Sequence, residues 1–333
     1  MRSPSVCPPG TGYRRRRKPH EKTTLRARPR PAAGSLPAGL GAGPGLVHRD
    51  ITISATEIGQ TVSQGNTTEA DDAPVIKQRD SSNSTDKVIK VIAEKDATAN
   101  VTLDGVNIDT SKNGMTGRDQ AALRTEGDGD VNIELDGDNY LKSSFASHAA
   151  GLNKGNSGTL TINDEDNSGK LEATGGYGGA GIGGGYDSST SDITITGGTI
   201  TARGSNSGAG IGGGNHGNGS NITISGGDVT AIGSVYAAGI GGELDGSNIT
   251  ISNGKVTAIG GDQGGAGIGG GFWYSGSDIT ISGGDVEATG GGLAAGIGGG
   301  NGGNGSKINI SGGKITAKGG TGGAGIGGGR SGT

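Results

Sequence analysis

Hydrophobic and polar residues alternate in short segments of this chain, and the alternation repeats with a fixed period. Residues 192–196 read Asp-Ile-Thr-Ile-Thr, and residues 199–202 read Thr-Ile-Thr-Ala. Alternation of this kind predicts strands with one buried face. Between consecutive pairs stands a motif of the form Gly-Ala-Gly-Ile-Gly-Gly-Gly, whose isoleucine recurs at spacings of 29, 29, 28, 29 and 29 residues, as Ile182, Ile211, Ile240, Ile268, Ile297 and Ile326.

A period in this range indicates a solenoid, in which each repeat forms one coil. We predict an all-β fold, a single-stranded parallel β-helix that turns right-handed, with about 29 residues and three short strands per coil. The alternation places Ile193 and Ile195 inward on the first strand, Ile200 and Ala202 on the second, and Ile182 on the third. A Gly-Gly corner joins the first two strands.

The period begins before the glycine motif becomes regular. Leu103, Ile133 and Ile162 are 30 and 29 residues apart and precede the series Ile195, Ile224, Ile251, Ile281 and Ile310. We therefore expect these residues to stack on one another. The predicted β-helix covers residues 88–333, with irregular coils at 88–174 and regular glycine-rich coils at 175–333. Residues 50–87 are expected to form a polar N-terminal segment or a loose first coil.

Composition separates residues 1–49 from this domain. Residues 1–50 carry 11 Lys and Arg against 2 Asp and Glu, and they hold eight of the nine prolines and Cys7. We expect a disordered basic leader rich in Pro and Arg, or a segment foreign to the domain. The remainder has a net charge of −13, which would repel phosphates, so we expect no nucleic-acid partner. No apolar run approaches the roughly 20 residues of a membrane span, so no membrane insertion is expected.

Two acidic loops resemble metal-binding loops, with oxygen ligands at alternate positions: Asp164, Asp166 and Ser168 in one, and Glu126, Asp128 and Asp130 in the other. The first resembles the start of an EF-hand loop, but its twelfth position is Gly175 rather than Glu. Either loop is a candidate for structural calcium, and the alternative is a solvated acidic turn. The glycine motif itself matches the dinucleotide-binding fingerprint, but a strand rather than a helix follows each copy, so the match is a false positive.

A polysaccharide-degrading enzyme would need a cluster of carboxylates. The column Asp228, Lys255, Asp285 and Lys314 instead alternates in sign, which avoids stacked like charges. His148 and His216 have no evident acid or nucleophile partner in the sequence. We therefore expect no catalytic residues and no enzyme activity.

Aromatic residues give the best indication of function. Phe272, Trp273 and Tyr274 follow one glycine motif, and Tyr186 occupies the position of Phe272 in an earlier repeat. Rings exposed on a polar surface suit stacking on sugars. The alternative is that the loops fold these rings onto the glycine face. A column of outward threonines beginning at Thr194 also allows ice binding, although such columns are typical of exposed β-ladders.

Repeats such as residues 221–231, Asn-Ile-Thr-Ile-Ser-Gly-Gly-Asp-Val-Thr-Ala, together with the glycine motif, resemble glycine-rich repeats of secreted or wall-attached proteins of anaerobic Gram-positive bacteria. They are also similar to the polysaccharide-binding parallel β-helix family first known from a cellulose-degrading clostridium. The resemblance covers residues 88–333. It implies surface display, binding of polysaccharide or cell-wall glycan, and bound calcium, although the clustered acidic calcium sites of that family have no clear match here.

We therefore expect an extracellular, non-catalytic module that binds polysaccharide or mediates cell-surface adhesion. Its candidate sugar-binding residues are the four aromatic residues. The main alternative is a purely structural spacer rod that associates end to end. Ice binding and polysaccharide degradation rank below these two.

Overall fold

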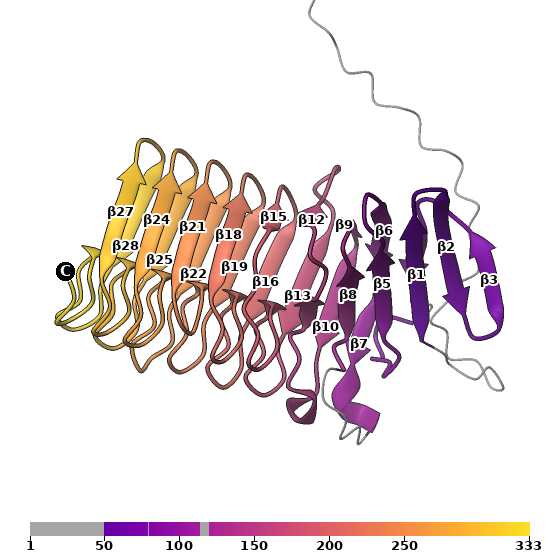
Figure 1. Cartoon of the computed structure of the whole chain (residues 1–333), viewed down its shortest axis with the longest axis horizontal. Coiled ribbons are helices and arrows are strands. Elements are labelled where there is room, and N and C mark those ends of the chain that lie inside the picture. The colour runs from indigo at the N-terminus through magenta and orange to yellow at the C-terminus, as the bar shows by residue number, and fades with distance from the viewer. Residues whose placement is uncertain (1–49, 79, 114–119) are drawn as a thin grey trace, which may run out of the picture. The chain divides into compact units, whose positions relative to one another are not determined.

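Strands from successive repeats stack in parallel into three sheets, which together form a parallel β-helix (Figure 1). The computed structural model describes residues 50–78, 80–113 and 120–333. Each regular coil contributes one strand to every sheet, and the coils follow one another in sequence order. The predicted all-β solenoid with three short strands per coil is confirmed. The leader predicted for residues 1–49 lies outside the described residues.

The largest sheet is named the glycine sheet, because its strands in the regular coils read Ile-Gly. Its strands are β1 (Ile51–Thr56), β2 (Gly59–Gln64), β3 (Thr67–Ala70), β5 (Ile89–Ala93), β8 (Leu123–Gly127), β11 (Leu152–Lys154), β14 (Ile182–Gly183), β17 (Ile211–Gly212), β20 (Ile240–Gly241), β23 (Ile268–Gly269), β26 (Ile297–Gly298) and β29 (Ile326–Gly327).

The second sheet is named the threonine sheet. Its strands are β4 (Val75–Lys77), β6 (Thr98–Asp104), β9 (Asp130–Asp136), β12 (Leu160–Asn163), β15 (Ile193–Ile195), β18 (Gly219–Ile224), β21 (Gly246–Ile251), β24 (Gly276–Ile281) and β27 (Gly305–Ile310). Its outward threonines stack in register from Thr194 to Thr280, and the column ends at Asn309.

The third sheet is named the ion-pair sheet. Its strands are β7 (Asn107–Asp109), β10 (Asp138–Lys142), β13 (Lys170–Thr174), β16 (Thr199–Arg203), β19 (Asp228–Ile232), β22 (Lys255–Ile259), β25 (Asp285–Thr289) and β28 (Lys314–Lys318). The alternating charges predicted on its surface form ion pairs, with 2.9 Å from Lys255 to Asp228 and 2.9 Å from Lys314 to Asp285. Two short 3₁₀ helices complete the described elements, η1 (Thr110–Asn113) and η2 (Phe145–Ser147).

The core consists of columns of like side chains. Ile182 pairs with Ile211, and the column continues in register to Ile326. Ile195 likewise begins the predicted column that ends at Ile310. The inward residues of the internal coils are fully buried, so every coil adds apolar burial to the coil before it.

One predicted register is wrong. Leu103 was expected to stack on Ile133, but it pairs with Leu135, and Val101 pairs with Ile133. The prediction is therefore displaced by two residues. Such a displacement keeps every inward side chain inward, so the hydrophobic pattern cannot detect it. The later part of this column, from Ile133 to Ile162 and Ile195, is as predicted.

The glycines of the glycine sheet permit very close contact between coils. Gly212 has a φ of 128°, a backbone conformation that favours glycine. A Cβ placed on it would lie 1.9 Å from the carbonyl oxygen of Gly241 in the next coil. The predicted Gly-Gly corner has the same requirement, because Gly198 has a φ of 88°. The glycine motif therefore determines how the chain turns and how closely coils stack.

Residues 50–87 begin the solenoid. β1 pairs in parallel with β5, β1 and β2 pair antiparallel, and β2 and β3 also pair antiparallel. Glutamine side chains satisfy backbone groups of the next coil: the Gln60 Oε1 accepts from the Asn100 nitrogen at 2.8 Å, and the Gln78 Oε1 accepts from the Asn107 nitrogen at 2.8 Å. The two glutamines therefore substitute for strand partners at the N-terminal end of the solenoid.

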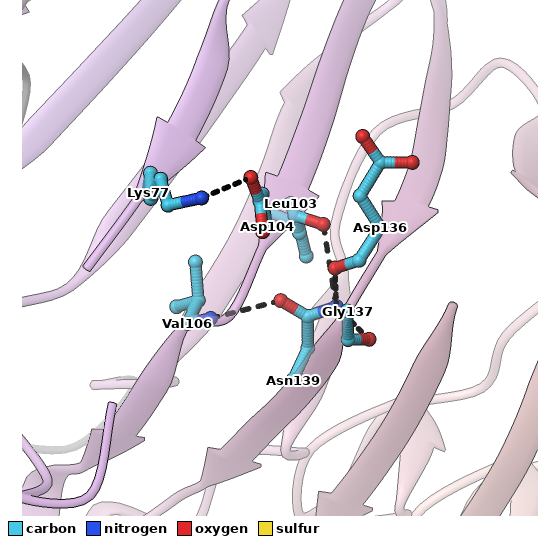
Figure 2. A network of polar contacts seen from close by, with 7 residues as sticks. All are labelled: Lys77, Leu103, Asp104, Val106, Asp136, Gly137 and Asn139. Atoms are coloured by element: carbon cyan, nitrogen blue, oxygen red, sulfur yellow. Dashed lines mark hydrogen bonds and ion pairs between the residues drawn. The ribbon is translucent and has the colours of Figure 1, made fainter. Parts of the chain in front are cut away.

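A buried asparagine interrupts the apolar column of the ion-pair sheet. Asn139 is fully buried and pairs with Leu171. Figure 2 shows its amide between two coils, where Oδ1 accepts from the Val106 nitrogen at 2.9 Å and Nδ2 lies 3.3 Å from the Leu103 carbonyl oxygen. Nδ2 also lies 3.1 Å from the carbonyl oxygen of Lys170 in the following coil. One side chain therefore links three consecutive coils.

Candidate functional site

Trp273 is the most exposed aromatic side chain in the regular coils that the structure describes, with 65% of its surface accessible. It lies in the loop between β23 and β24. Phe272 meets the Trp273 ring edge-on at 5.2 Å between centroids, and Tyr236 from the preceding coil lies 5.4 Å from Phe272. The three residues are named the Trp273 patch. Tyr274, the next candidate, is 38% exposed and makes no ring contact with the other described aromatic residues.

The backbone beneath the Trp273 patch is held in an unusual conformation. Trp273 has a φ of 71°, a region that bulky residues rarely adopt. Its nitrogen donates to the Asn301 carbonyl at 2.7 Å, and the Phe272 nitrogen donates to the Tyr236 carbonyl at 2.9 Å. Strain of this kind costs about 1–3 kcal/mol and persists only where the surroundings impose it.

Glycine makes room for the rings of the patch. A Cβ at Gly302, in the next coil, would lie 2.1 Å from the Trp273 ring. A Cβ at Gly264 would lie 3.0 Å from the Phe272 ring, and Phe272 is half-buried there. The two alternatives for the aromatic residues thus coexist, since Phe272 folds onto glycine while Trp273 keeps most of its surface in solvent.

A second aromatic group surrounds Tyr186 and is named the Tyr186 cluster. The Tyr186 ring stacks on Tyr177 at 6.0 Å and lies 5.5 Å from each of His148 and His216. Phe145 meets Tyr177 edge-on at 5.0 Å. Tyr186 is half-buried against Gly178, where a Cβ would lie 2.5 Å from its ring. Tyr186 itself therefore offers less free ring surface than Trp273, although Phe145 at the edge of the cluster is 64% exposed.

The expectation that His216 lacks an acid partner is wrong. Its Nδ1 lies 2.9 Å from the Asp187 Oδ1, which comes from the preceding coil. Both residues occupy the same position in consecutive repeats, 29 residues apart, so the solenoid period itself brings them together. Both side chains are exposed.

The acidic loops do not converge as metal sites. Glu126 pairs with Lys90 and Arg124, Asp128 accepts from the Ser157 hydroxyl, and Asp130 accepts from the Thr159 nitrogen. In the described ranges, no three His, Cys, Asp or Glu side chains lie close enough together to hold a metal ion. The carboxylates of the second loop instead bind neighbouring strands or side chains.

The EF-hand-like loop also has local hydrogen bonds. Asp164 is buried and its Oδ2 accepts from the Gly169 nitrogen at 2.9 Å, while Asp166 accepts from the Ser168 nitrogen at 3.0 Å. These bonds close the loop within its own backbone. The Asp164 Oδ1 is buried and has no hydrogen-bond partner among the described residues.

The sequence prediction missed a polar pocket around Lys154. The pocket has a volume of about 310 Å³, and residues 153–157 of one coil and 184–185 and 188–191 of the next line it. Lys154 is only 9% exposed, and burial lowers the pKa of its ammonium below its ordinary value. The signal was present in β11, because alternation from the inward Leu152 places Lys154 on the inward face.

A second hollow, of about 340 Å³, lies over the first strands of the ion-pair sheet. Tyr140, Asn107 and Glu172 are among the residues that line it. Lys142 pairs with Asp109 there at 3.1 Å, and Glu172 pairs with Lys170. Its charged groups are therefore already paired.

Comparison with known proteins agrees with the architecture. The model of the beta helix repeat family matches six segments, at residues 167–186, 193–215, 222–246, 249–272, 279–301 and 308–330. These segments are similar to the repeats of that family, and the structure has the fold of a parallel β-helix. Comparisons with curated proteins and with solved structures found no match. Within the described residues of this β-helix protein, no helix is long and apolar enough to cross a membrane.

Proposed function

We propose that this β-helix protein is an extracellular, non-catalytic module that binds polysaccharide or cell-wall glycan, and so mediates adhesion, through the Trp273 patch. The observation that carries the proposal is the exposed Trp273 ring, held in a strained backbone conformation beside Phe272. A planar ring that keeps one face accessible can stack on the apolar face of a sugar. An exposed aromatic group on an otherwise polar surface is typical of an interaction site.

The resemblance of the repeats to surface proteins of anaerobic Gram-positive bacteria supports the extracellular location. The non-catalytic role is supported by the pairing of charged groups along the ion-pair sheet, where Lys255, Lys314 and Lys318 each contact a carboxylate of the preceding coil. Such pairs balance charge and leave the carboxylates engaged. A sugar-release assay on the glycans that bind would test this part, and release of soluble sugar would contradict it.

Glycan binding is tested with insoluble polysaccharides and a glycan array. Trp273 is the only tryptophan, so a change in intrinsic fluorescence reports directly on the patch. We expect the wild-type protein to bind at least one polysaccharide with a fluorescence change. We expect Trp273→Ala to reduce the affinity roughly tenfold, the scale of one lost ring-stacking contact.

The control variant is Ile58→Ala. Ile58 is 99% exposed in the turn between β1 and β2, so this change removes exposed apolar surface away from the patch. Equal binding by Trp273→Ala and the wild type would overturn the assignment of the patch. Absence of binding to every glycan on the array would overturn the proposed function.

A further inference from the structure

Lys154 occupies an inward position that the two adjacent coils fill with smaller residues. It pairs in register with Thr125 of the preceding coil. Gly184 is its equivalent in the following coil, since Asn153 pairs with Gly183. A Cβ on Gly184 would lie 2.4 Å from the Ser188 carbonyl oxygen and 2.8 Å from the Thr190 Oγ1, so glycine here lets residues 188–191 approach this strand and line one pocket with Lys154. The long side chain of Lys154 therefore borders a pocket rather than a filled core.

The ammonium of Lys154 is buried with few partners. Its Nζ donates to the Asn156 carbonyl oxygen at 2.7 Å, its only hydrogen bond to the described residues, and it forms no ion pair with them. An ammonium has three donors, so two are available. Burying a charged group with so little compensation costs stability, and an apolar side chain of similar length would avoid this cost.

A second group in the pocket also lacks a partner. Thr190 is 4% exposed, and its Oγ1 is buried without a hydrogen bond to the described residues. The other side chains that line the pocket are neutral and polar, namely Asn153, Asn156, Ser157, Ser188, Ser189 and Ser191. The hydroxyls of Ser157, Ser188 and Ser191 donate to Asp128, the Tyr186 carbonyl and Asp192, so their oxygens remain available as acceptors. Buried polar atoms are nearly always hydrogen-bonded, so Lys154 and Thr190 together mark a place where a ligand completes the bonding.

The charge of the pocket limits the ligand to one negative charge. Among the described residues that line it, Lys154 is the only charged one. Asp130 and Asp192 are the acids whose fields reach Lys154, and each accepts hydrogen bonds elsewhere, from the Thr159 nitrogen and the Asn221 amide. A dianion such as phosphate would leave one charge unmatched near these two carboxylates. Hydroxyl and amide groups around a single ammonium suit the hydroxyls and the one anionic group of an acidic sugar.

We propose that this pocket binds an acidic sugar with one negative charge, a uronate or a sugar sulfate ester, whose anionic group contacts the Lys154 ammonium and whose hydroxyl groups reach Thr190 and the serines. The site is separate from the Trp273 patch. It would give this protein a preference for acidic glycans, which the aromatic patch alone does not provide. The inference does not depend on the function proposed for the patch.

Titration calorimetry with the full chain tests this inference. The probes are glucuronate, a galactose monosulfate ester and neutral galactose. We expect at least one acidic probe to bind at least about tenfold more tightly than the neutral one, the scale of one charge-assisted hydrogen bond. The acidic probe that binds more tightly identifies the anionic group. Equal affinity for all three probes, or no binding of either acidic probe, would overturn the proposal.

Two variants locate the site. Lys154→Met keeps the length of the side chain and removes its charge, and we expect it to bind the preferred acidic probe roughly tenfold less tightly. Thr190→Val removes an oxygen with no described protein partner, so it should weaken binding severalfold without lowering stability. Thr190→Val also keeps the test valid if Lys154→Met does not fold. Unchanged affinity in both variants would contradict the assignment.

Lys318→Met is the matched charge control. Lys318 is exposed in β28 and contacts Glu287 at 3.0 Å, so its loss changes the net charge equally at a distant coil. We expect its affinity to match that of the wild type. An equal loss in Lys318→Met and Lys154→Met would show general attraction to anions and would reject the pocket. Trp273→Ala is tested in parallel to separate the two sites. The pocket proposal requires that Lys154→Met lose affinity for the acidic probe, whether or not Trp273→Ala also loses affinity.

Discussion

The side-chain oxygen of Asn139 accepts a hydrogen bond from the backbone nitrogen of Val106 at 2.9 Å, inside the solenoid. Val106 occupies the equivalent position one coil earlier, since Tyr140 pairs with Asn107. The backbone of Val106 is thus bound by a side chain of the next coil. Because this asparagine also reaches the Lys170 carbonyl, the contact couples three coils and concerns stability rather than function.

Replacement of Asn139 by leucine should destabilise the solenoid. Leucine fits the apolar column that includes Leu171, but it leaves the Val106 nitrogen and the carbonyls around it without partners. Each unsatisfied buried group costs about 1–3 kcal/mol, so we expect Asn139→Leu to lower the free energy of unfolding by at least about 2 kcal/mol. Urea denaturation followed by circular dichroism measures this.

The control for this change is Asn132→Ala. Asn132 lies outward on β9, and its amide donates to the Asn100 side chain at 3.0 Å in an exposed contact. Its loss should change the free energy of unfolding by less than about 0.5 kcal/mol. If both changes lower the free energy of unfolding by similar amounts, the buried amide of Asn139 contributes no more stability than an exposed one.

Stacking of the glycine sheet gives a second prediction, with its control in the same column. Gly212 and Gly327 have nearly equal φ values, 128° and 130°. A Cβ on Gly212 would lie 1.9 Å from the Gly241 carbonyl oxygen, whereas a Cβ on Gly327 would have only the Ala324 Cβ nearby, at 3.6 Å. Gly212→Ala therefore adds a collision between coils to the same backbone strain.

We expect Gly327→Ala to cost about 1 kcal/mol, because alanine rarely adopts this positive φ, and Gly212→Ala to cost at least about 2 kcal/mol more. Thermal and urea unfolding of both variants measure the difference. Equal destabilisation would show that backbone conformation, rather than close stacking of coils, requires the glycine column.

Periodicity in the sequence is sufficient to predict the solenoid, because identical isoleucines recur at one interval and every coil needs the same neighbours. It does not determine register where the strands lengthen. Leu103 could stack on Ile133 or Leu135 with the same inward face, and only the packing of the longer strand β9 selects Leu135. The hydrogen bond between Gln60 and Asn100 is also not predictable from the sequence, because it joins residues 40 positions apart and the repeat gives no signal for it.

The candidate sites were predictable to different degrees. Trp273 could be predicted as a candidate because it follows a glycine motif whose position the repeat defines. The contact between Asp187 and His216 follows from their equal place in consecutive repeats, yet it needs alignment of the loops as well as the strands. The Lys154 pocket depends on the close approach of residues 188–191 to Gly184, which lies 30 residues from Lys154, so the hydrophobic pattern alone only places the lysine inward.

The support beneath Trp273 gives a third prediction. Gly302 has a φ of 82°, and a Cβ there would lie 2.1 Å from the Trp273 ring. Gly302→Ala should therefore displace the ring and, because alanine rarely adopts this positive φ, lower the free energy of unfolding by about 1 kcal/mol. If the patch binds glycan as proposed, this variant should lose affinity as Trp273→Ala does.

Fluorescence separates displacement of the ring from general unfolding. Trp273 is the only tryptophan, so its emission should shift in Gly302→Ala while the circular dichroism of the solenoid stays that of the wild type. Gly322→Ala is the control, since Gly322 has a similar φ of 85° and a Cβ there would meet only Arg330, at 3.7 Å. An unchanged emission spectrum in Gly302→Ala would show that Trp273 does not rest on Gly302.

The buried ammonium of Lys154 gives a fourth prediction, on the pH dependence of stability. Burial lowers the pKa of this group in the folded chain, whereas the unfolded chain keeps the ordinary value near 10.5. Between the lowered pKa and 10.5, the unfolded chain holds a proton on Lys154 that the folded chain lacks. The contribution of Lys154 to the free energy of unfolding therefore rises with pH across this window, and it is lost as the pH falls from 10.5 through the folded pKa. Lysines with raised pKa, such as Lys77 and Lys255, act in the opposite direction.

The wild type must therefore be compared with Lys154→Met rather than considered alone. We expect the methionine variant to be the more stable protein at pH 7 and its advantage to shrink as the pH approaches 10.5, in urea unfolding measured at several pH values. A constant difference between the two proteins over this range would show that the Lys154 ammonium is as well solvated in the folded chain as in the unfolded one.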